Sequence, residues 1–465
     1  MQDISTWLTS QSKIVTRAGV CPFISAKGSI ALAELRTHLF NYLIARYAAI
    51  KGKKGIFILR CDDTDTSQTD TTLMPLIVSM FNDILEAKPD LHPYNSEQTL
   101  KYPLIQSKRN ELYEKYIAQL EDCRILYKKK SNDPFIFSIK KYIEHYGNII
   151  QVNDLLLGNF TYDLLYEQRI HDFPLTRANG NSLWHLCSVV DDFNCGVNLV
   201  IRAQDKIGNI PYQEMIRSAL NLPFKAYLHL PLMLPDKNLN SLNFLSTVNE
   251  LMKEGISSRA IVIYLVSSLF NQENNTYLNV KDFLFNLDFY KLKKTSSRFN
   301  LNKLYAINKK LQDNFLDNDY LKELSKCAAI KEDTEWNNLL SKDFIKKFLL
   351  GLRLDYIKSR VILNSLINPS YLVNRFNNYK ETLNLLNELE KNDANFSIIK
   401  KIRILIIENK SLIPLFRWIL TGEISGISIF KILDFLEQSK FLLIERINTA
   451  KNSLVNHLKT NNAVS

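Results

Sequence analysis

The segment that most constrains the fold is a helical pattern that runs almost directly into a short apolar strand. Residues Arg36–Ala49 space their apolar side chains along one helix face, and a glycine-bounded turn at 52–55 leads into the apolar run Ile56–Arg60. Such a run after a turn predicts a buried strand. A helix followed by a buried strand is typical of a doubly wound α/β sheet, where ligands bind beyond the carboxyl ends of the strands. We therefore expect an amino-terminal α/β domain with its functional loops at that edge.

The pattern changes along the chain. A further helix is predicted over Thr71–Ala87 and a further strand over Val197–Arg202, with a helix that begins near Pro211. Residues 96–183 are less regular, which indicates an inserted subdomain, and from about residue 246 the pattern is almost wholly helical. An α/β amino half and an all-α carboxyl half require at least two domains.

The charge balance favours a polyanionic partner. The 465 residues include 59 Lys and Arg against 48 Asp and Glu, a formal net charge of +11. Nucleic acid is the first candidate, although a basic protein without such a partner has the same composition. No apolar run reaches the roughly 18 residues of a membrane span, and no charged leader precedes an apolar run. We therefore expect a cytoplasmic protein that does not bind membranes.

The six cysteines are scattered without a CxxC pair. Zinc sites and disulfide frameworks use characteristic cysteine spacings that this chain lacks. We therefore expect free thiols and no metal site in the protein.

Five segments within residues 17–270 carry a resemblance to a known family. In chain order they are Arg36-Thr37-His38-Leu39-Phe40-Asn41-Tyr42-Leu43, Phe57–Asp65, Ser188–Asp192, Val200–Asp205 with Asn209 and Pro211, and His229–Leu232. Their order and spacing together resemble bacterial-type glutamyl-tRNA synthetase, a class I aminoacyl-tRNA synthetase. The resemblance implies a doubly wound, Rossmann-like catalytic domain with an inserted subdomain, followed by an all-α domain. It also implies activation of glutamate with ATP and Mg²⁺, and transfer to tRNA-Glu.

The resemblance also implies a division of the chain into five parts, acting as a monomer. Residues 1–95 and 184–245 would form the two halves of the nucleotide-binding fold, and 96–183 the inserted subdomain that binds the acceptor stem. Residues 246–320 would form a helical stem-contact domain, and 321–465 a helical domain like those that bind anticodons.

Candidate glutamate-binding residues carry over from the family position by position. Arg17 and Arg202 match arginines that bind the side-chain carboxylate, a role that suits the guanidinium fork. Asp62 stands where the family has a Glu that holds the ammonium group, and Trp184 replaces a Tyr. A lone arginine at a strand end is more often a surface or ion-pair residue, so that alternative stays open.

The resemblance places ATP near Gly28, Gln204 and Lys237, where Gln204 replaces a family Glu. It places the acceptor stem near basic residues that suit phosphate contacts, namely Lys128, Lys129, Lys130, Lys140 and Lys141. Such lysines are more often a solvated surface. Three further polar residues of the shared segments could equally be capping or turn residues, namely Thr64, Asp191 and Asp192.

Both nucleotide signatures of the family are altered. The first aligns with Ala31-Leu32-Ala33-Glu34, which has neither its histidine nor its glycine, and a carboxylate there repels triphosphate. His38 lies two helical turns further on, roughly 10 Å away, which we consider too far to substitute. The second, lysine-rich signature aligns with Asn238-Leu239-Asn240-Ser241-Leu242, with only Lys237 beside it. Loss of one preorganised donor costs about 3–4 kcal/mol of transition-state stabilisation, so we expect impaired activation.

Three functions remain open at this stage. The first is a divergent glutamate–tRNA ligase with impaired ATP-dependent activation. The second is a possible pseudoenzyme, a non-catalytic paralogue that keeps the tRNA-binding surface. The third is an interaction protein without tRNA binding, against which the positive net charge argues mildly.

Overall fold

The computed structural model describes residues 4–97, 99–167, 169–235, 247–271, 277, 279–367, 379–390, 395–423, 425–438 and 440–462. The chain divides into two compact units, one of residues 1–251 with 258–308 and one of residues 252–257 with 309–465. Within the described residues, no helix is long and apolar enough to cross a membrane.

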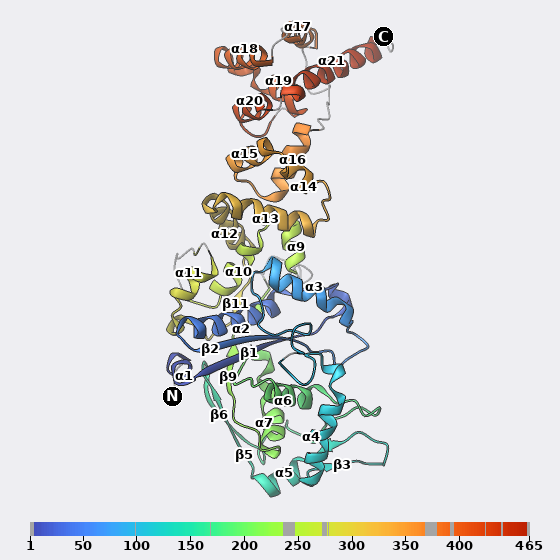
Figure 1. The fold of residues 1–465 in the computed structure, drawn as a ribbon, viewed down its shortest axis with the longest axis vertical. Coiled ribbons are helices and arrows are strands. Elements are labelled where there is room, and N and C mark those ends of the chain that lie inside the picture. The colour runs from blue at the N-terminus through green and yellow to red at the C-terminus, as the bar shows by residue number, and fades with distance from the viewer. Residues whose placement is uncertain are drawn as a thin grey trace. The chain divides into compact units, whose positions relative to one another are not determined.

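The first unit is built around parallel strands (Figure 1). Strand β1 (Lys13–Val20) pairs in parallel with β2 (Lys54–Cys61). A second sheet has the order β6-β5-β9-β8, from β5 (Ile149–Asp154), β6 (Gly158–Asp163), β8 (Leu199–Ala203) and β9 (Ala226–Leu230). In that sheet β9 is parallel to both β8 and β5, and β6 is antiparallel to β5. The parallel core confirms the predicted α/β class.

The two sheets are joined at residue 198 by backbone and side-chain hydrogen bonds, and the backbone N–H of Asn198 donates to the carbonyl of Val15 at 3.3 Å. Asn198, just before β8, accepts a hydrogen bond from the backbone N–H of Val15 with its Oδ1 at 2.8 Å. Its Nδ2 donates to the carbonyl of Lys13, also at 2.8 Å. The amide therefore stands in for a peptide group between β1 and β8.

Helices cover the strands. The predicted helix at Arg36–Ala49 is confirmed as α2 (Leu32–Ile50), and the predicted strand at Ile56–Arg60 lies within β2. In Figure 1, α2 lies on one side of β1 and β2, and α6 (Trp184–Asn194) and α7 (Ile210–Ala219) lie on the other. Helix α1 (Ile4–Ser10) precedes β1. Both α2 and α6 bury most of their residues, which holds the ends of these strands between helices.

The segment predicted as one helix at Thr71–Ala87 is interrupted. It forms a 3-10 turn (Thr71–Leu73), then α3 (Met74–Ser79), then a π-helical stretch (Met80–Ile84). Pro75 falls in the first turn of α3, where its missing N–H is tolerated, so the proline starts a new helix there. The periodicity of apolar residues could not reveal this break.

Residues between the two halves of the core form a small sheet and a hairpin. Helices α4 (Asn110–Asp122) and α5 (Ile139–Tyr146) accompany a three-stranded sheet of order β3-β4-β7. Its strands are β3 (Leu126–Tyr127), β4 (Ile136–Phe137) and β7 (Phe173–Pro174). The β5–β6 hairpin, in contrast, extends the core sheet, so the region expected as an insertion also contributes to the core.

The remainder is mainly helical, as predicted. In the first unit it includes α10 (Ser258–Ser267) and α11 (Val280–Phe285), while α9 (Val248–Lys253) and α12 (Leu301–Asn314) each run from the first unit into the second. A short parallel pair, β10 (Met233–Leu234) with β11 (Ser297–Arg298), is an unpredicted exception. Among the described residues, the second unit contains α13 (Asp317–Ile330), α14 (Trp336–Leu340), α15 (Asp343–Leu352), α16 (Tyr356–Ile367), α17 (Tyr379–Glu390), α18 (Asn395–Glu408), α19 (Ile413–Thr421), α20 (Ile429–Gln438) and α21 (Lys440–Asn462).

Candidate functional site

A cavity of about 570 Å³ lies at the carboxyl ends of β1, β2 and β8. Its walls come from those strand ends, the first turns of α2, the start of α6 and the 3-10 turn at Gln204–Asn209. All four residues predicted to bind glutamate line it, namely Arg17, Asp62, Trp184 and Arg202. The fold therefore gathers, from segments far apart in the chain, the side chains that the resemblance singled out.

Asp62 is held tightly on one side of the cavity. Its Oδ1 and Oδ2 accept bonds from Nε and Nη2 of Arg60 at 2.5 and 2.9 Å, and Trp184 donates from Nε1 to Oδ2 at 3.4 Å. Gly19 faces this carboxylate so closely that a Cβ there would lie 2.3 Å from Oδ2. The carboxylate of Asp62 is thus held in one position, and the indole of Trp184 stands beside it where the family has a tyrosine.

Arg17 has one guanidinium nitrogen that is hydrogen-bonded and another that has no partner in the part of the chain that the structure describes. Its Nε donates to Oδ1 of Asp192 at 2.9 Å, and that oxygen also accepts from Nη1 of Arg60 at 3.0 Å. Nη2 of Arg17 is buried and has no hydrogen-bond partner among the described residues. The neighbouring cations hold the pKa of Asp192 well below its usual range despite its burial, so it stays ionised. An acceptor oxygen that reached Nη2 of Arg17 would satisfy this buried donor.

Arg202 is held by neutral groups instead. Its Nε donates to Nε2 of His229 at 3.0 Å, and its Nη1 donates to Oε1 of Gln213 at 2.8 Å. Nη2 of Arg202 is also buried without a partner in the described structure. Burial lowers the pKa of Arg202 from that of free arginine, though not enough to discharge a guanidinium near neutral pH. Two buried arginines therefore bring unsatisfied donors to one cavity.

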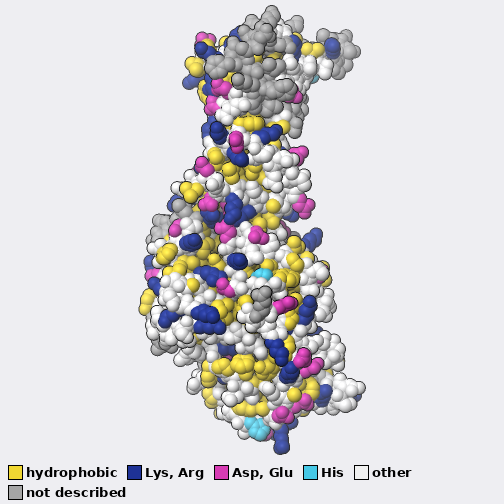
Figure 2. Space-filling model, in the orientation of Figure 1, with side chains coloured by type: hydrophobic (Ala, Val, Ile, Leu, Met, Phe, Trp, Pro, Cys, Tyr) yellow, Lys and Arg dark blue, Asp and Glu magenta, His cyan; other side chains and the backbone are white. Residues whose placement is uncertain are grey.

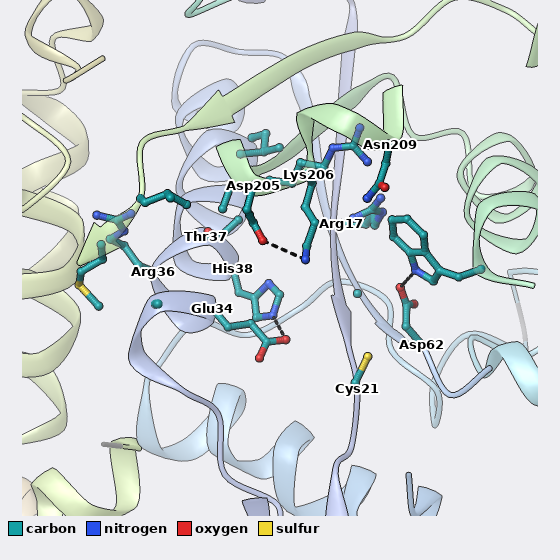
Figure 3. A pocket seen from close by; sticks show the side chains of 18 of the residues that line it. Arg17, Cys21, Glu34, Arg36, Thr37, His38, Asp62, Asp205, Lys206 and Asn209 are labelled. Atoms are coloured by element: carbon teal, nitrogen blue, oxygen red, sulfur yellow. Dashed lines mark hydrogen bonds and ion pairs between the residues drawn. The ribbon is translucent and has the colours of Figure 1, made fainter. Parts of the chain in front are cut away.

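The other part of the cavity carries two further pairs of side chains in contact (Figure 3). On α2, Oε1 of Glu34 lies 3.2 Å from Nε2 of His38, and after β8 Nζ of Lys206 lies 2.9 Å from Oδ2 of Asp205. In Figure 3 Lys206 lies between Arg17 on one side and Glu34 with His38 on the other. His38, which the sequence analysis set aside as too distant, thus lines the same cavity as the altered signature.

The described residues among those predicted to bind ATP do not line the cavity as the predicted glutamate-binding residues do. Ala33 and Glu34 of the first signature line the cavity, whereas Gly28 and Gln204 are absent from its lining. Gln204 donates from Nε2 to the carbonyl of Lys294 at 3.3 Å. Lys237 and the second signature at Asn238–Leu242 lie outside the described residues. The nucleotide assignments therefore remain predictions.

The predicted acceptor-stem lysines lie on and around the small sheet. Four of them are exposed, namely Lys128, Lys129, Lys130 and Lys140, and the fifth, Lys141, donates to the carbonyl of Leu126 at 3.5 Å. The ammonium of Lys128 lies 4.0 Å from the ring centroid of Phe135. On the visible face in Figure 2, Lys and Arg are distributed among acidic and apolar side chains rather than gathered over one element.

Asp191 and Asp192 are neither capping nor turn residues. Both are buried in α6, where Asp191 accepts bonds from Arg109, Gln106 and Tyr113. Sequence reasoning also missed Arg60 and His229 as supports of the site. The sequence did offer one signal for each residue. Arg60 lies near a strand end in the family-like segment Phe57–Asp65, and His229 opens the family-like segment His229–Leu232.

The cysteines are free thiols in the structure. Cys21 lines the cavity, and its burial, with Asp62 and Glu34 nearby, raises the pKa of the thiol to about 12. A thiol with so high a pKa is protonated near neutral pH and is a poor nucleophile.

Comparison with known proteins places these features in a family. A sequence profile described as tRNA synthetases class I (E and Q), catalytic domain, matches residues 22–133 and 121–306. The glutamate–tRNA ligase of Methylacidiphilum infernorum is 29% identical over 301 residues, which are 64% of this chain and 64% of that protein. The chain thus spans slightly under two thirds of the length of that relative. The glutamate–tRNA ligase of Buchnera aphidicola subsp. Cinara cedri is 25% identical over 93% of this chain and 96% of its own length.

A solved structure shares the fold. The glutamate tRNA ligase from Elizabethkingia meningosepticum, in complex with its amino acid, superposes with a TM-score of 0.70 at 20% identity. The superposition covers 95% of this chain and 100% of that chain. Because the matching profile covers more than half of the sequence, this chain belongs to the class I tRNA synthetases of the E and Q type.

Proposed function

We propose that the cavity binds L-glutamate and that the chain acts in tRNA aminoacylation as a glutamate–tRNA ligase. The observation that carries this proposal is the pair of buried arginines, Arg17 and Arg202, each with an unsatisfied Nη2 in the described structure. A carboxylate is an acceptor-only group that can take both donors, whereas an amide would present a donor of its own. Asp62 then offers its carboxylate to the ammonium group of the same ligand.

The charges around the cavity support an anionic ligand. Arg17, Arg60 and Lys225 share the carboxylate of Asp192, whereas Arg202 has only neutral partners among the described residues. A buried charge whose hydrogen-bond partners are all neutral is costly, so a bound carboxylate would stabilise Arg202 further.

Ligation by this family requires ATP with Mg²⁺, and the described residues do not by themselves fit a triphosphate. Glu34 stands in the first turn of α2 and lines the cavity, so its carboxylate opposes the phosphates that a helix N-terminus otherwise attracts. The second signature lies outside the described residues.

Glu34 also favours a second candidate, a protein that binds glutamate and tRNA without activating the amino acid. The two candidates share the glutamate site and the exposed lysines at 128–130, which we propose to contact tRNA phosphates. They differ only in whether ATP is consumed.

Three measurements on the purified full chain separate the candidates. Calorimetric titration with L-glutamate tests the cavity, glutamate-dependent exchange of pyrophosphate into ATP tests activation, and charging of tRNA-Glu with labelled glutamate tests ligation. Binding with exchange and charging supports the ligase, and binding without either supports the second candidate. Absence of glutamate binding contradicts both.

A further inference from the structure

The guanidinium of Arg202 depends on a buried chain of three residues that starts on the β5–β6 hairpin. Asp154 ends β5, His229 lies on β9 and Arg202 on β8, so neighbouring strands of one sheet supply all three. All three side chains are buried, and the exposed fraction of His229 is 0%. This series of hydrogen-bonded side chains reaches the cavity at Arg202, the one residue of the three that lines it.

The carboxylate of Asp154 determines which nitrogen of His229 carries the proton. Its Oδ1 accepts the backbone N–H groups of Leu156 and Leu157 at 2.9 and 2.8 Å. Its Oδ2 accepts the backbone N–H of His229 at 3.1 Å and lies 2.6 Å from Nδ1 of the same residue. An ionised carboxylate only accepts hydrogen bonds, so Nδ1 of His229 must be the donor.

The other ring nitrogen of His229, Nε2, faces the guanidinium of Arg202, which can only donate hydrogen bonds. Nε of Arg202 lies 3.0 Å from Nε2 of His229, and a guanidinium has no acceptor. Nε2 must therefore hold a lone pair, which leaves His229 neutral with its proton on Nδ1. Burial also lowers the pKa of His229, which is consistent with a neutral ring.

We propose that Asp154 and His229 are positioning residues for the amino-acid site: Asp154 fixes the Nδ1–H tautomer of His229, whose Nε2 then orients Arg202 toward the ligand. A carboxylate in place of His229 would hold Arg202 more strongly but would also neutralise its charge. A neutral acceptor fixes the geometry and leaves the positive charge for the ligand. The effect on ligand affinity rests on the proposed glutamate site, whereas the tautomer does not.

The tautomer can be measured without any ligand. In ¹⁵N NMR of the full chain, His229 should show a protonated Nδ1 and an unprotonated Nε2. In Asp154→Asn the oxygen that stays opposite Leu156 and Leu157 leaves an N–H₂ facing both Nδ1 and the backbone N–H of His229. The preference for the Nδ1–H form should then be lost, and the fraction of the Nε2–H form, which cannot accept from Arg202, should rise. A wild-type ring protonated on Nε2 would overturn the proposal.

Two substitutions of His229 separate positioning from simple structural support. In His229→Gln the side-chain carbonyl reaches the place of Nε2 and can accept from Arg202, whereas in His229→Asn the amide reaches only the place of Nδ1 and can donate only to Asp154. We expect His229→Gln to bind L-glutamate within about threefold of wild type, and His229→Asn to bind at least about tenfold more weakly.

A purely structural role predicts the reverse order, because the Asn variant keeps the donor that the buried Asp154 carboxylate needs. Equal or better glutamate binding by His229→Asn would therefore contradict the proposal, and urea denaturation of both variants confirms that each is folded. If wild type binds no glutamate, the proposed function fails, and the tautomer measurement still decides whether Asp154 and His229 hold Arg202 in this way.

Discussion

Glu34 and His38 lie one turn apart on α2, with Oε1 of Glu34 3.2 Å from Nε2 of His38, and both side chains line the cavity. The side chain of Glu34 is 37% exposed, whereas that of His38 is 7% exposed. The pair places an accessible carboxylate at the last position of the altered first signature, Ala31–Glu34, so this position is the first test of the nucleotide site.

Removal of the charge on Glu34 should improve ATP binding. Glu34→Gln keeps the shape of the side chain, and a single carboxylate near a phosphate in water costs about 1 kcal/mol, or about fivefold in affinity. We expect Glu34→Gln to lower the Kd for Mg-ATP by that factor in calorimetric titration. Glu111→Gln, which changes an exposed carboxylate paired with Lys115 on α4, is the matched control. Unchanged affinity in Glu34→Gln would show that ATP does not approach this turn.

Replacement of either Arg17 or Arg202 by an uncharged residue should weaken glutamate binding. Hydrogen bonds to charged groups contribute about 1.5–3 kcal/mol, so Arg17→Met and Arg202→Met should each raise the Kd for L-glutamate at least about tenfold. Arg46→Met removes an arginine that pairs with Asp90 away from the cavity and should leave the Kd unchanged. If both cavity variants bind glutamate as wild type does, the ligand carboxylate lies elsewhere.

A methyl group at position 19 should displace Asp62. In Gly19→Ala the new Cβ would lie 2.3 Å from Oδ2 of Asp62, a distance that forces the carboxylate or the strand to move. We expect a loss of stability of about 1–3 kcal/mol and weaker glutamate binding. Gly208→Ala, whose Cβ would meet no atom within 4 Å, should change neither the thermal midpoint nor the Kd. Equal behaviour of the two variants would contradict the packing described for Asp62.

Asp192 should make stability depend on pH in the acid range. Its folded-state pKa is depressed by Arg17, Lys225 and Arg60, although burial opposes this shift. A depressed pKa contributes stability that is fully present above the unfolded value near 3.9 and is lost as the pH falls toward the folded value. The wild-type free energy of unfolding should therefore decline below about pH 4.

Asp192→Asn tests this assignment. The variant leaves buried cations without their carboxylate, which should cost about 3–5 kcal/mol near neutral pH and flatten the acid decline. Urea denaturation at a series of pH values measures both effects. Asp122→Asn, at an exposed position on α4, should reproduce the wild-type curve. An acid decline in Asp192→Asn as steep as in wild type would assign the pH dependence to other groups.

Local patterns in the sequence predicted the elements that frame the site. Apolar spacing predicted α2 except for its first turn, and most of β2, because both elements bury the residues that carry the pattern. The break within Thr71–Ala87 was missed, because a 3-10 turn, a helix and a π stretch share similar apolar spacing.

The supporting ion pairs were beyond sequence reasoning. Arg60 and Asp192 are 132 residues apart, and Asp154 and His229 are 75 residues apart, so no spacing rule connects them. Arg17 and Arg202 were anticipated only through their resemblance to a family. Their charge alone does not distinguish them from surface arginines. What does distinguish them, a buried Nη2 without a hydrogen-bond partner in the described structure, depends on the folded arrangement of the strands.

Asn198 has a consequence for the distance between the two arginines of the cavity. Arg17 lies on β1 and Arg202 on β8, and these strands belong to separate hydrogen-bonded sheets that Asn198 bridges with two bonds of 2.8 Å. The placement of the two guanidinium groups is therefore held at residue 198 by two side-chain bonds and one backbone bond rather than by a continuous ladder. A substitution at residue 198, which does not line the cavity, would therefore change the distance between Arg17 and Arg202 without removing a residue of the cavity wall.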